Sequence, residues 1–130
     1  MERRSFFAAV LGALGLSTDP APRAESSKRH VELLRAPLAG YSYYQADRVL
    51  NTLNEGTPLV LRREPANPYD RHAVEILTTD GVKLGYIPRV SVRAIARNLD
   101  RGIPVRARIC QLNREDESWR RIQIECFVEY

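Results

Sequence analysis

Apolar and polar residues alternate along several short stretches of the chain, and this two-residue period is typical of half-buried β-strands. The Asp80-Gly81 dipeptide separates two of these stretches and predicts a tight hairpin turn. Pro65 and Pro88 each end a stretch, because proline lacks the N–H that a strand needs. The pattern therefore predicts six strands, at 30–40, 58–65, 73–77, 83–87, 105–112 and 121–128.

Two other stretches carry apolar residues at the spacing of an amphipathic helix. In 43–53 these residues are Ala46, Val49, Leu50 and Leu53, and Gly56 is expected to end that helix. In 91–102 they are Val92, Ile95, Ala96 and Leu99, with Arg93, Arg97 and Arg101 on the other side and Gly102 at the end. The predicted fold class is mainly β with two helices (α+β), arranged as a small β-barrel, since closure hides the edges of short strands.

The first 24 residues have the layout of a targeting segment. Arg3 and Arg4 precede an uncharged apolar run from Phe6 to Leu16, and the arginine pair resembles a twin-arginine export signal. The run is shorter than the roughly 20 residues that span a bilayer, so no membrane span is expected. We expect an exported, periplasmic protein with a signal segment at 1–24, a linker at 25–33 and a domain at 34–130. The alternatives are a helix packed on the domain and a start codon placed too early, with a cytoplasmic protein.

The two cysteines are predicted to lie on opposite faces of their strands. Cys110 alternates with Val105, Ala107 and Ile109, whereas Cys126 shares a face with the apolar residues of the last strand. We therefore expect no disulfide between them. Neither cysteine has a nearby histidine in sequence, so no zinc site is predicted, and no other metal or cofactor is expected.

The chain shows no glycine-rich phosphate loop, paired histidines or nucleophile elbow. Asp70 and His72 are close in sequence, but such neighbours on a turn point apart and do not form an acid/base pair. The sequence therefore predicts a protein that is not an enzyme.

The net charge of +4 favours anionic partners, because a positive surface attracts polyanions at long range. Of the 20 basic residues only Lys28 and Lys83 are lysines, so most of the charge is on guanidinium groups, which suit phosphate and aromatic rings. A GC-rich genome would produce the same composition.

Tyrosines and an arginine gather where predicted strands end. Tyr41, Tyr43 and Tyr44 follow the first strand, Tyr69 lies in a turn, and Tyr86 and Arg89 follow the hairpin. Rings that stack on bases and guanidinium groups that neutralise phosphates are typical of single-stranded nucleic-acid sites. The alternative is that these tyrosines complete the core or rim of a small domain.

The stretches LRREPANPYDRHAVEI and GVKLGYIPR, with a pair of tyrosines after a glycine, resemble the HIRAN domain over about Leu34 to Tyr130. This domain occurs in helicase-like DNA repair ATPases and as a free-standing bacterial module. The resemblance implies an OB-like barrel with added helices, and a pocket that binds the free 3′ end of single-stranded DNA.

The resemblance also implies roles for individual residues. Tyr43 would stack on an end nucleotide, and Asn67, Tyr69 and Asp70 would form the wall that reads the terminal base and its 3′ hydroxyl. Arg89 would hold the phosphate backbone. Tyr44 and Tyr86 complete the set, with Tyr86 in the place of a different ring, and Ser42 stands where the characterised member has an arginine.

The turn PANPYD is predicted to form without help from its aromatic ring. The Asn67 side chain can bridge to the backbone two residues on, Pro68 fixes one torsion, and Asp70 can cap the residues that follow. The ring of Tyr69 is then free to bind a ligand, or it covers the hairpin. A different function also fits the export signal: a non-catalytic domain of the bacterial cell envelope that binds an unidentified protein.

Overall fold

The computed structural model describes residues 28–130, and its compact unit is His30–Glu129. The predicted signal segment at 1–24 and the first part of the predicted linker, 25–27, lie outside the described residues. Within residues 28–130 no helix has the length and apolar character needed to cross a membrane.

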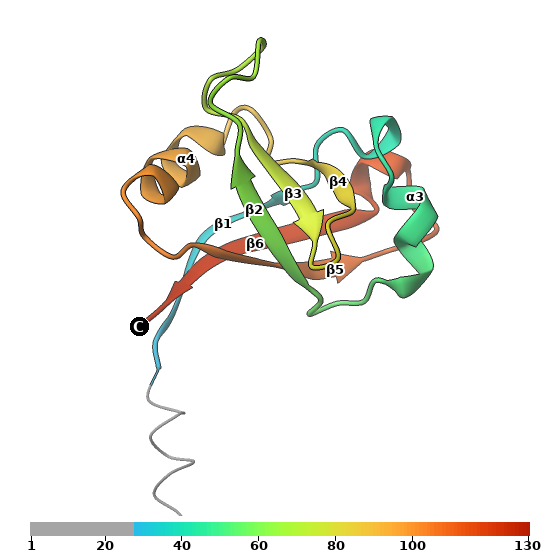
Figure 1. The fold of residues 1–130 in the computed structure, drawn as a ribbon. Helices are drawn as coiled ribbons and strands as arrows, with labels where there is room; N and C mark the ends of the chain where they lie inside the picture. The colour runs from blue at the N-terminus through green and yellow to red at the C-terminus, as the bar shows by residue number, and fades with distance from the viewer. Residues whose placement is uncertain (1–27) are drawn as a thin grey trace, which may run out of the picture. The chain divides into compact units, whose positions relative to one another are not determined.

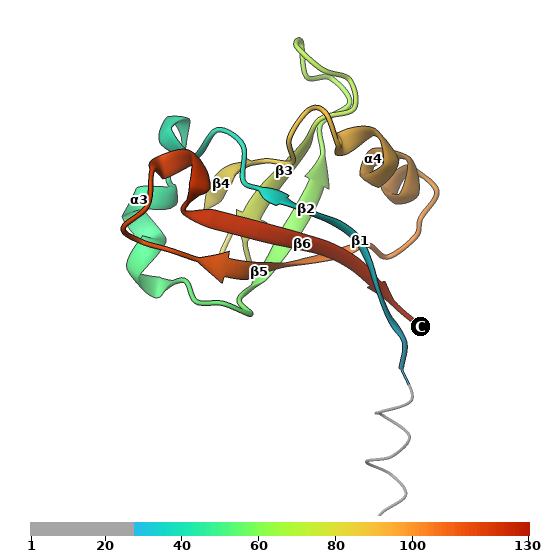
Figure 2. The same cartoon turned by 180° about the vertical axis from the view of Figure 1, so that it is seen from behind.

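All six predicted strands are present and form one antiparallel sheet in the order β1-β6-β5-β2-β3-β4. Two helices complete the unit, α3 (Ala46–Val49) and α4 (Val92–Asp100), and they lie at opposite ends of the sheet (Figures 1 and 2). The mainly β fold with two helices is therefore confirmed. The strands are β1 (His30–Pro37), β2 (Pro58–Arg63), β3 (Val74–Thr78), β4 (Lys83–Tyr86), β5 (Arg106–Leu112) and β6 (Ile122–Glu129).

The sheet is OB-like but is not closed into a barrel. The edge strands β1 and β4 are connected only through an isolated bridge, in which Ala39 and Tyr86 each donate an N–H to the other's carbonyl at 2.9 Å. The pairing cannot lengthen into a ladder, because β1 ends at Pro37 and the chain turns at Gly40, whose φ of 78° is left-handed. The bridge itself requires Gly85, since a Cβ there would collide with the carbonyl oxygen of Ala39.

The core lies between the sheet and the helices. Ile76, Leu84, Ile109 and Ile124 are fully buried strand residues, and α4 adds the inward residues that its spacing predicts, Val92, Ile95 and Ala96. The apolar periodicity therefore located both the strands and this helix correctly.

The predicted helix at 43–53 is wrong as a continuous element. The chain forms a 3-10 turn at Tyr41–Tyr43, then α3, then a second 3-10 turn at Leu50–Thr52, and Leu53 is already extended. The inward residues do reach the core, but the Thr52 hydroxyl donates to the Val49 carbonyl at 2.7 Å, a side-chain bond that competes with the helix. Gly56 (φ 92°) therefore belongs to a separate turn, in which the Thr57 N–H donates to the Asn54 carbonyl.

Both cysteines are free, as predicted, with Cys126 buried and Cys110 half-buried. Burial raises the pKa of the Cys126 thiol to about 12, so this side chain acts as a small apolar residue of the core.

Candidate nucleic-acid interface

The loop between β2 and β3, which extends away from the sheet in Figure 1, is held together by its polar side chains. The Asn67 Oδ1 accepts the N–H of Tyr69 at 2.8 Å and that of Asp70 at 3.1 Å, and its Nδ2 donates to Glu64 at 3.0 Å. Asp70 in turn accepts the N–H of His72 at 2.9 Å. The predicted turn chemistry is confirmed, and it leaves the ring of Tyr69 83% exposed.

This loop forms one wall of a pocket of about 320 Å³, which we call the tyrosine pocket. Residues after β1 and after β4 provide the other walls. Six of the seven residues that the sequence singled out line it together: Tyr44, Asn67, Tyr69, Asp70, Tyr86 and Arg89. Ala39, Pro68, Ala73 and Ile87 add apolar surface.

Tyr43 is the residue that the structure does not bring into the pocket. It ends the 3-10 turn before Tyr44, is 85% exposed, and is absent from the lining. Ser42, in the same turn, donates its hydroxyl to Ser118 at 3.1 Å. Tyr41 is buried in the core, where its hydroxyl donates to Asp47 at 2.6 Å. The three tyrosines that follow β1 therefore occupy three different environments.

Arg89 is positioned at the rim of the tyrosine pocket by the loop. Its Nη2 donates to the carbonyl of Tyr69 at 2.9 Å, and its Nε lies 3.9 Å from a carboxylate oxygen of Asp70. The side chain is nevertheless 76% exposed, so most of its N–H groups face solvent. The pocket thus combines an open aromatic face, a carboxylate acceptor and an available guanidinium group.

Sequence reasoning missed the polar network behind the pocket. The Lys83 ammonium donates to the Tyr86 hydroxyl at 2.7 Å, and that hydroxyl donates to Glu64 at 2.6 Å. The same ammonium lies 4.5 Å from the ring centre of Tyr44 and 4.3 Å from that of Tyr86. The ammonium therefore makes cation–π contacts with both rings in addition to its hydrogen bond. The rarity of lysine in this arginine-rich chain was the available signal.

The network fixes the charge state of these groups. Burial and the hydrogen bond to Glu64 raise the pKa of Tyr86 to about 12, so the phenol stays neutral. Although burial opposes the shift, the hydrogen bonds from Tyr86 and Asn67 lower the pKa of Glu64. Behind the tyrosine pocket, Lys83 and Glu64 therefore form an ion pair, and the ammonium of that pair lies against the rings of Tyr44 and Tyr86.

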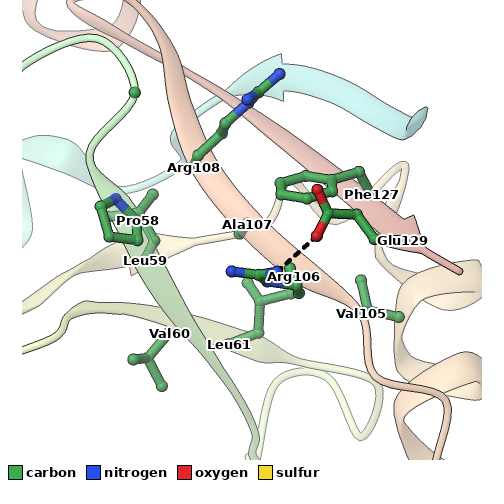
Figure 3. Close-up of a pocket in the computed structure, with 11 residues that line it drawn as sticks. Pro58, Leu59, Val60, Leu61, Val105, Arg106, Ala107, Arg108, Phe127 and Glu129 are labelled. Atoms are coloured by element: carbon green, nitrogen blue, oxygen red, sulfur yellow. Dashed lines mark hydrogen bonds and ion pairs between the residues drawn. The ribbon is translucent and has the colours of Figure 1, made fainter. Parts of the chain in front are cut away.

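A larger pocket of about 540 Å³ opens where the ladder between β2 and β5 ends, and we call it the sheet pocket (Figure 3). Its guanidinium groups are already paired: Arg106 with Glu129 and Arg108 with Glu125, each at 2.7 Å. Its aromatic residue, Phe127, is only 5% exposed. None of the seven singled-out residues lines this pocket, and its chemistry offers little to an anionic ligand.

Within the part of the chain that the structure describes, no three His, Cys, Asp or Glu side chains gather where they could hold a metal ion.

Fold and site together define a small, mainly β, OB-like module with a tyrosine-lined and partly basic pocket. The family profile of the HIRAN domain matches residues 31–130, and the chain belongs to the HIRAN family. HIRAN domains are nucleic-acid-binding modules, which is consistent with the expectation of a non-catalytic protein.

Two solved structures share the fold of this chain. A protein from Lactobacillus plantarum is 26% identical with a TM-score of 0.68, and the match covers 79% of this chain and 98% of that one. The HIRAN domain of human HLTF has a TM-score of 0.56 at 19% identity, with 77% of each chain covered, and shows the shared fold.

Among curated proteins, the helicase-like transcription factors of Mus musculus and Oryctolagus cuniculus are each 31% identical over 67 residues. The match covers 52% of this chain but 6% of either relative.

Proposed function

We propose that this domain binds DNA through the tyrosine pocket and recognises the free 3′ end of a single strand. One observation carries the proposal: Tyr69, Asp70 and Arg89 line the same pocket, and none of the three is buried in the hydrophobic core. A flat ring, a hydrogen-bond acceptor and a cation are the groups that a terminal base, its 3′ hydroxyl and its phosphate require.

The size of the tyrosine pocket supports an end rather than a duplex. Its volume of about 320 Å³ lies at the lower end of the range for small-molecule sites, about 300–1,000 Å³. In the proposed complex the terminal base stacks on Tyr69, and Asp70 accepts a hydrogen bond from the 3′ hydroxyl. Arg89 then contacts a phosphate. Asn67 supports the wall by holding the turn, since its amide oxygen already accepts two backbone N–H groups.

Tyr43 has a different place in the proposed complex. Its exposed ring lies outside the pocket, so it stacks on a nucleotide that has not entered. Ser42 supplies no charge where the family resemblance has an arginine, and the phosphate contact in the pocket therefore depends on Arg89.

The test is the binding of a fluorescent single-stranded oligonucleotide measured by anisotropy. We expect Tyr69→Ala to lose about 1–3 kcal/mol of binding free energy, the usual contribution of one stacked base. Tyr130→Ala, which removes another exposed tyrosine that does not line the pocket, is the matched control. Equal loss in both variants, or no binding by the unaltered protein, would contradict the proposal.

Neither the family match nor the relatives support the alternative of a protein-binding domain of the cell envelope. The export signal is a separate proposal, based on Arg3, Arg4 and the apolar run that follows. Cell fractionation tests it: we expect a shortened product in the periplasm, and a full-length cytoplasmic product would contradict it.

A further inference from the structure

Four arginines stand at every fourth position from the turn before α4 to its C-cap: Arg89, Arg93, Arg97 and Arg101. Arg89 lines the tyrosine pocket, and the other three are exposed. Residues four apart in a helix share a face and are separated by about 6 Å along its axis. Because Val92, Ile95 and Ala96 form the buried side of α4, the last three arginines lie on its solvent side, and Arg89 lies in the turn that precedes the helix. We call Arg93, Arg97 and Arg101 the arginine row.

The arginine row lacks the ion pairs that many other arginines of the domain make. Within residues 28–130, no carboxylate lies within salt-bridge distance of its three guanidinium groups. The only carboxylate on α4, that of Asp100, pairs with Arg63 of β2 at 2.9 Å instead. By contrast, a carboxylate partner is present for Arg35, Arg62, Arg63, Arg106, Arg108, Arg120 and Arg121.

The start of the row is unfavourable for α4, whereas Arg97 in the last turn and Arg101 at the C-cap lie near the negative end of the helix dipole. Like charges four residues apart repel each other. Arg93 lies in the first turn, where the helix dipole is positive, and that turn holds no acidic residue to offset it. A residue that destabilises the helix in which it lies, as Arg93 does, is expected at functional sites.

We propose that the arginine row binds the phosphate backbone of the DNA strand whose 3′ end occupies the tyrosine pocket, on the 5′ side of that end. This inference rests on the proposed function. The arrangement is suitable, because exposed guanidinium groups about 6 Å apart along an axis form a positive surface that can follow the backbone of a single strand. A guanidinium group can donate two parallel N–H bonds to one phosphate. The N–H groups of the arginine row remain available for such bonds, because they are exposed and have no carboxylate partner among the described residues.

The test compares single-stranded oligonucleotides of about 4 and about 16 nucleotides, both with a 3′ hydroxyl, by anisotropy at several salt concentrations. The unaltered protein is expected to bind the long strand more tightly. The double variant Arg97→Gln, Arg101→Gln is expected to lose most of this gain. Its salt dependence on the long strand should weaken, with the slope of log K against log salt falling by roughly 0.7 per lost contact.

The matched control is Arg35→Gln, Arg106→Gln, which removes the same charge from two exposed arginines that pair with Glu32 and Glu129. It is expected to keep the gain with length.

The outcomes separate the two proposals. If the unaltered protein binds no oligonucleotide, the proposed function and this inference both fail. If it binds the short strand but shows no gain with length, or if both double variants change that gain equally, the arginine row is not a backbone site and the proposed function stands.

Discussion

In the sheet pocket, Arg106 and Arg108 each donate to a carboxylate at 2.7 Å, and Phe127 is covered. In the tyrosine pocket, Arg89 bonds only a backbone carbonyl at short range, and the ring of Tyr69 stands open. The larger sheet pocket thus has more arginines, but each of them is already paired with a carboxylate of the same domain. In this basic protein the two pockets therefore differ in how closely each guanidinium group is paired with a carboxylate, rather than in the number of such groups.

The largest expected effect is a loss of folding stability when the carboxylate that pairs with Arg108 of the sheet pocket is removed. Glu125, 2% exposed, accepts from Arg108 at 2.7 Å and from His30 at 2.8 Å. We expect Glu125→Ala to lower the free energy of unfolding by about 2 kcal/mol, because it removes two charge-assisted hydrogen bonds of a buried carboxylate whose partners remain partly exposed. Urea denaturation measures this loss. DNA affinity of the remaining folded protein should not change, and a protein of unaltered stability would contradict the structural role.

Replacing one arginine in each pocket tests the difference between the two pockets directly. Arg89→Gln is expected to cost about 1.5 kcal/mol of DNA binding, the contribution of a hydrogen bond to a charged group, because its guanidinium is available to phosphate. Arg106→Gln removes the same charge from the sheet pocket and should leave the affinity within about 0.5 kcal/mol of the original. Anisotropy titrations measure both variants, and an equal loss of affinity in the two would contradict the difference between the pockets.

The network behind the tyrosine pocket should be structural in its effect. Tyr86→Phe removes the hydroxyl that joins Lys83 to Glu64 and keeps the ring. We expect a loss of about 1 kcal/mol in unfolding free energy, typical of a removed hydrogen bond. Chemical denaturation measures it, and a variant as stable as the original would show that the hydroxyl is dispensable.

The smallest expected effect is a difference in sensitivity to acid. Although burial opposes the shift, the hydrogen bonds from His30 and Arg108 lower the pKa of Glu125 below its ordinary value of 4.5. Its contribution to stability is therefore complete above pH 4.5 and is lost as the pH falls through the lowered folded-state pKa. Denaturation at a series of pH values should show a shallower acid loss for Glu125→Gln than for the original protein, and parallel curves would refute this assignment.

Much of the fold follows from local pattern. The alternation of apolar and polar residues predicted the bounds of β2 to β6 to within a residue or two. Turns such as Asp80-Gly81 and strand ends such as the one before Pro88 depend only on neighbouring residues. The prediction of one continuous helix at 43–53 was wrong, because helical spacing of apolar residues indicates which side chains face inward and not whether the backbone stays α-helical. Closure into a barrel failed for a related reason, since it depends on contacts between chain segments far apart in sequence.

The candidate site was predictable as a set of residues but not as a geometry. Asn67 and Asp70 were placed correctly because their bonds are local to the turn. Whether Tyr43 or Tyr44 enters the pocket depends on backbone torsions after a 3-10 turn, which side-chain identity does not encode. The pairing of Lys83 with Glu64 joins β4 to the loop after β2, and only the folded chain reveals it.

The most direct measurement of the central claim is a competition between two otherwise identical single strands, one ending in a 3′ hydroxyl and one in a 3′ phosphate. If Asp70 meets the strand end in the tyrosine pocket, the phosphate brings negative charge against the carboxylate, and the hydroxyl strand should bind at least about tenfold more tightly, or about 1.4 kcal/mol. Asp70→Asn should reduce that preference. Equal affinity for the two strands in the unaltered protein would contradict recognition of a 3′ end.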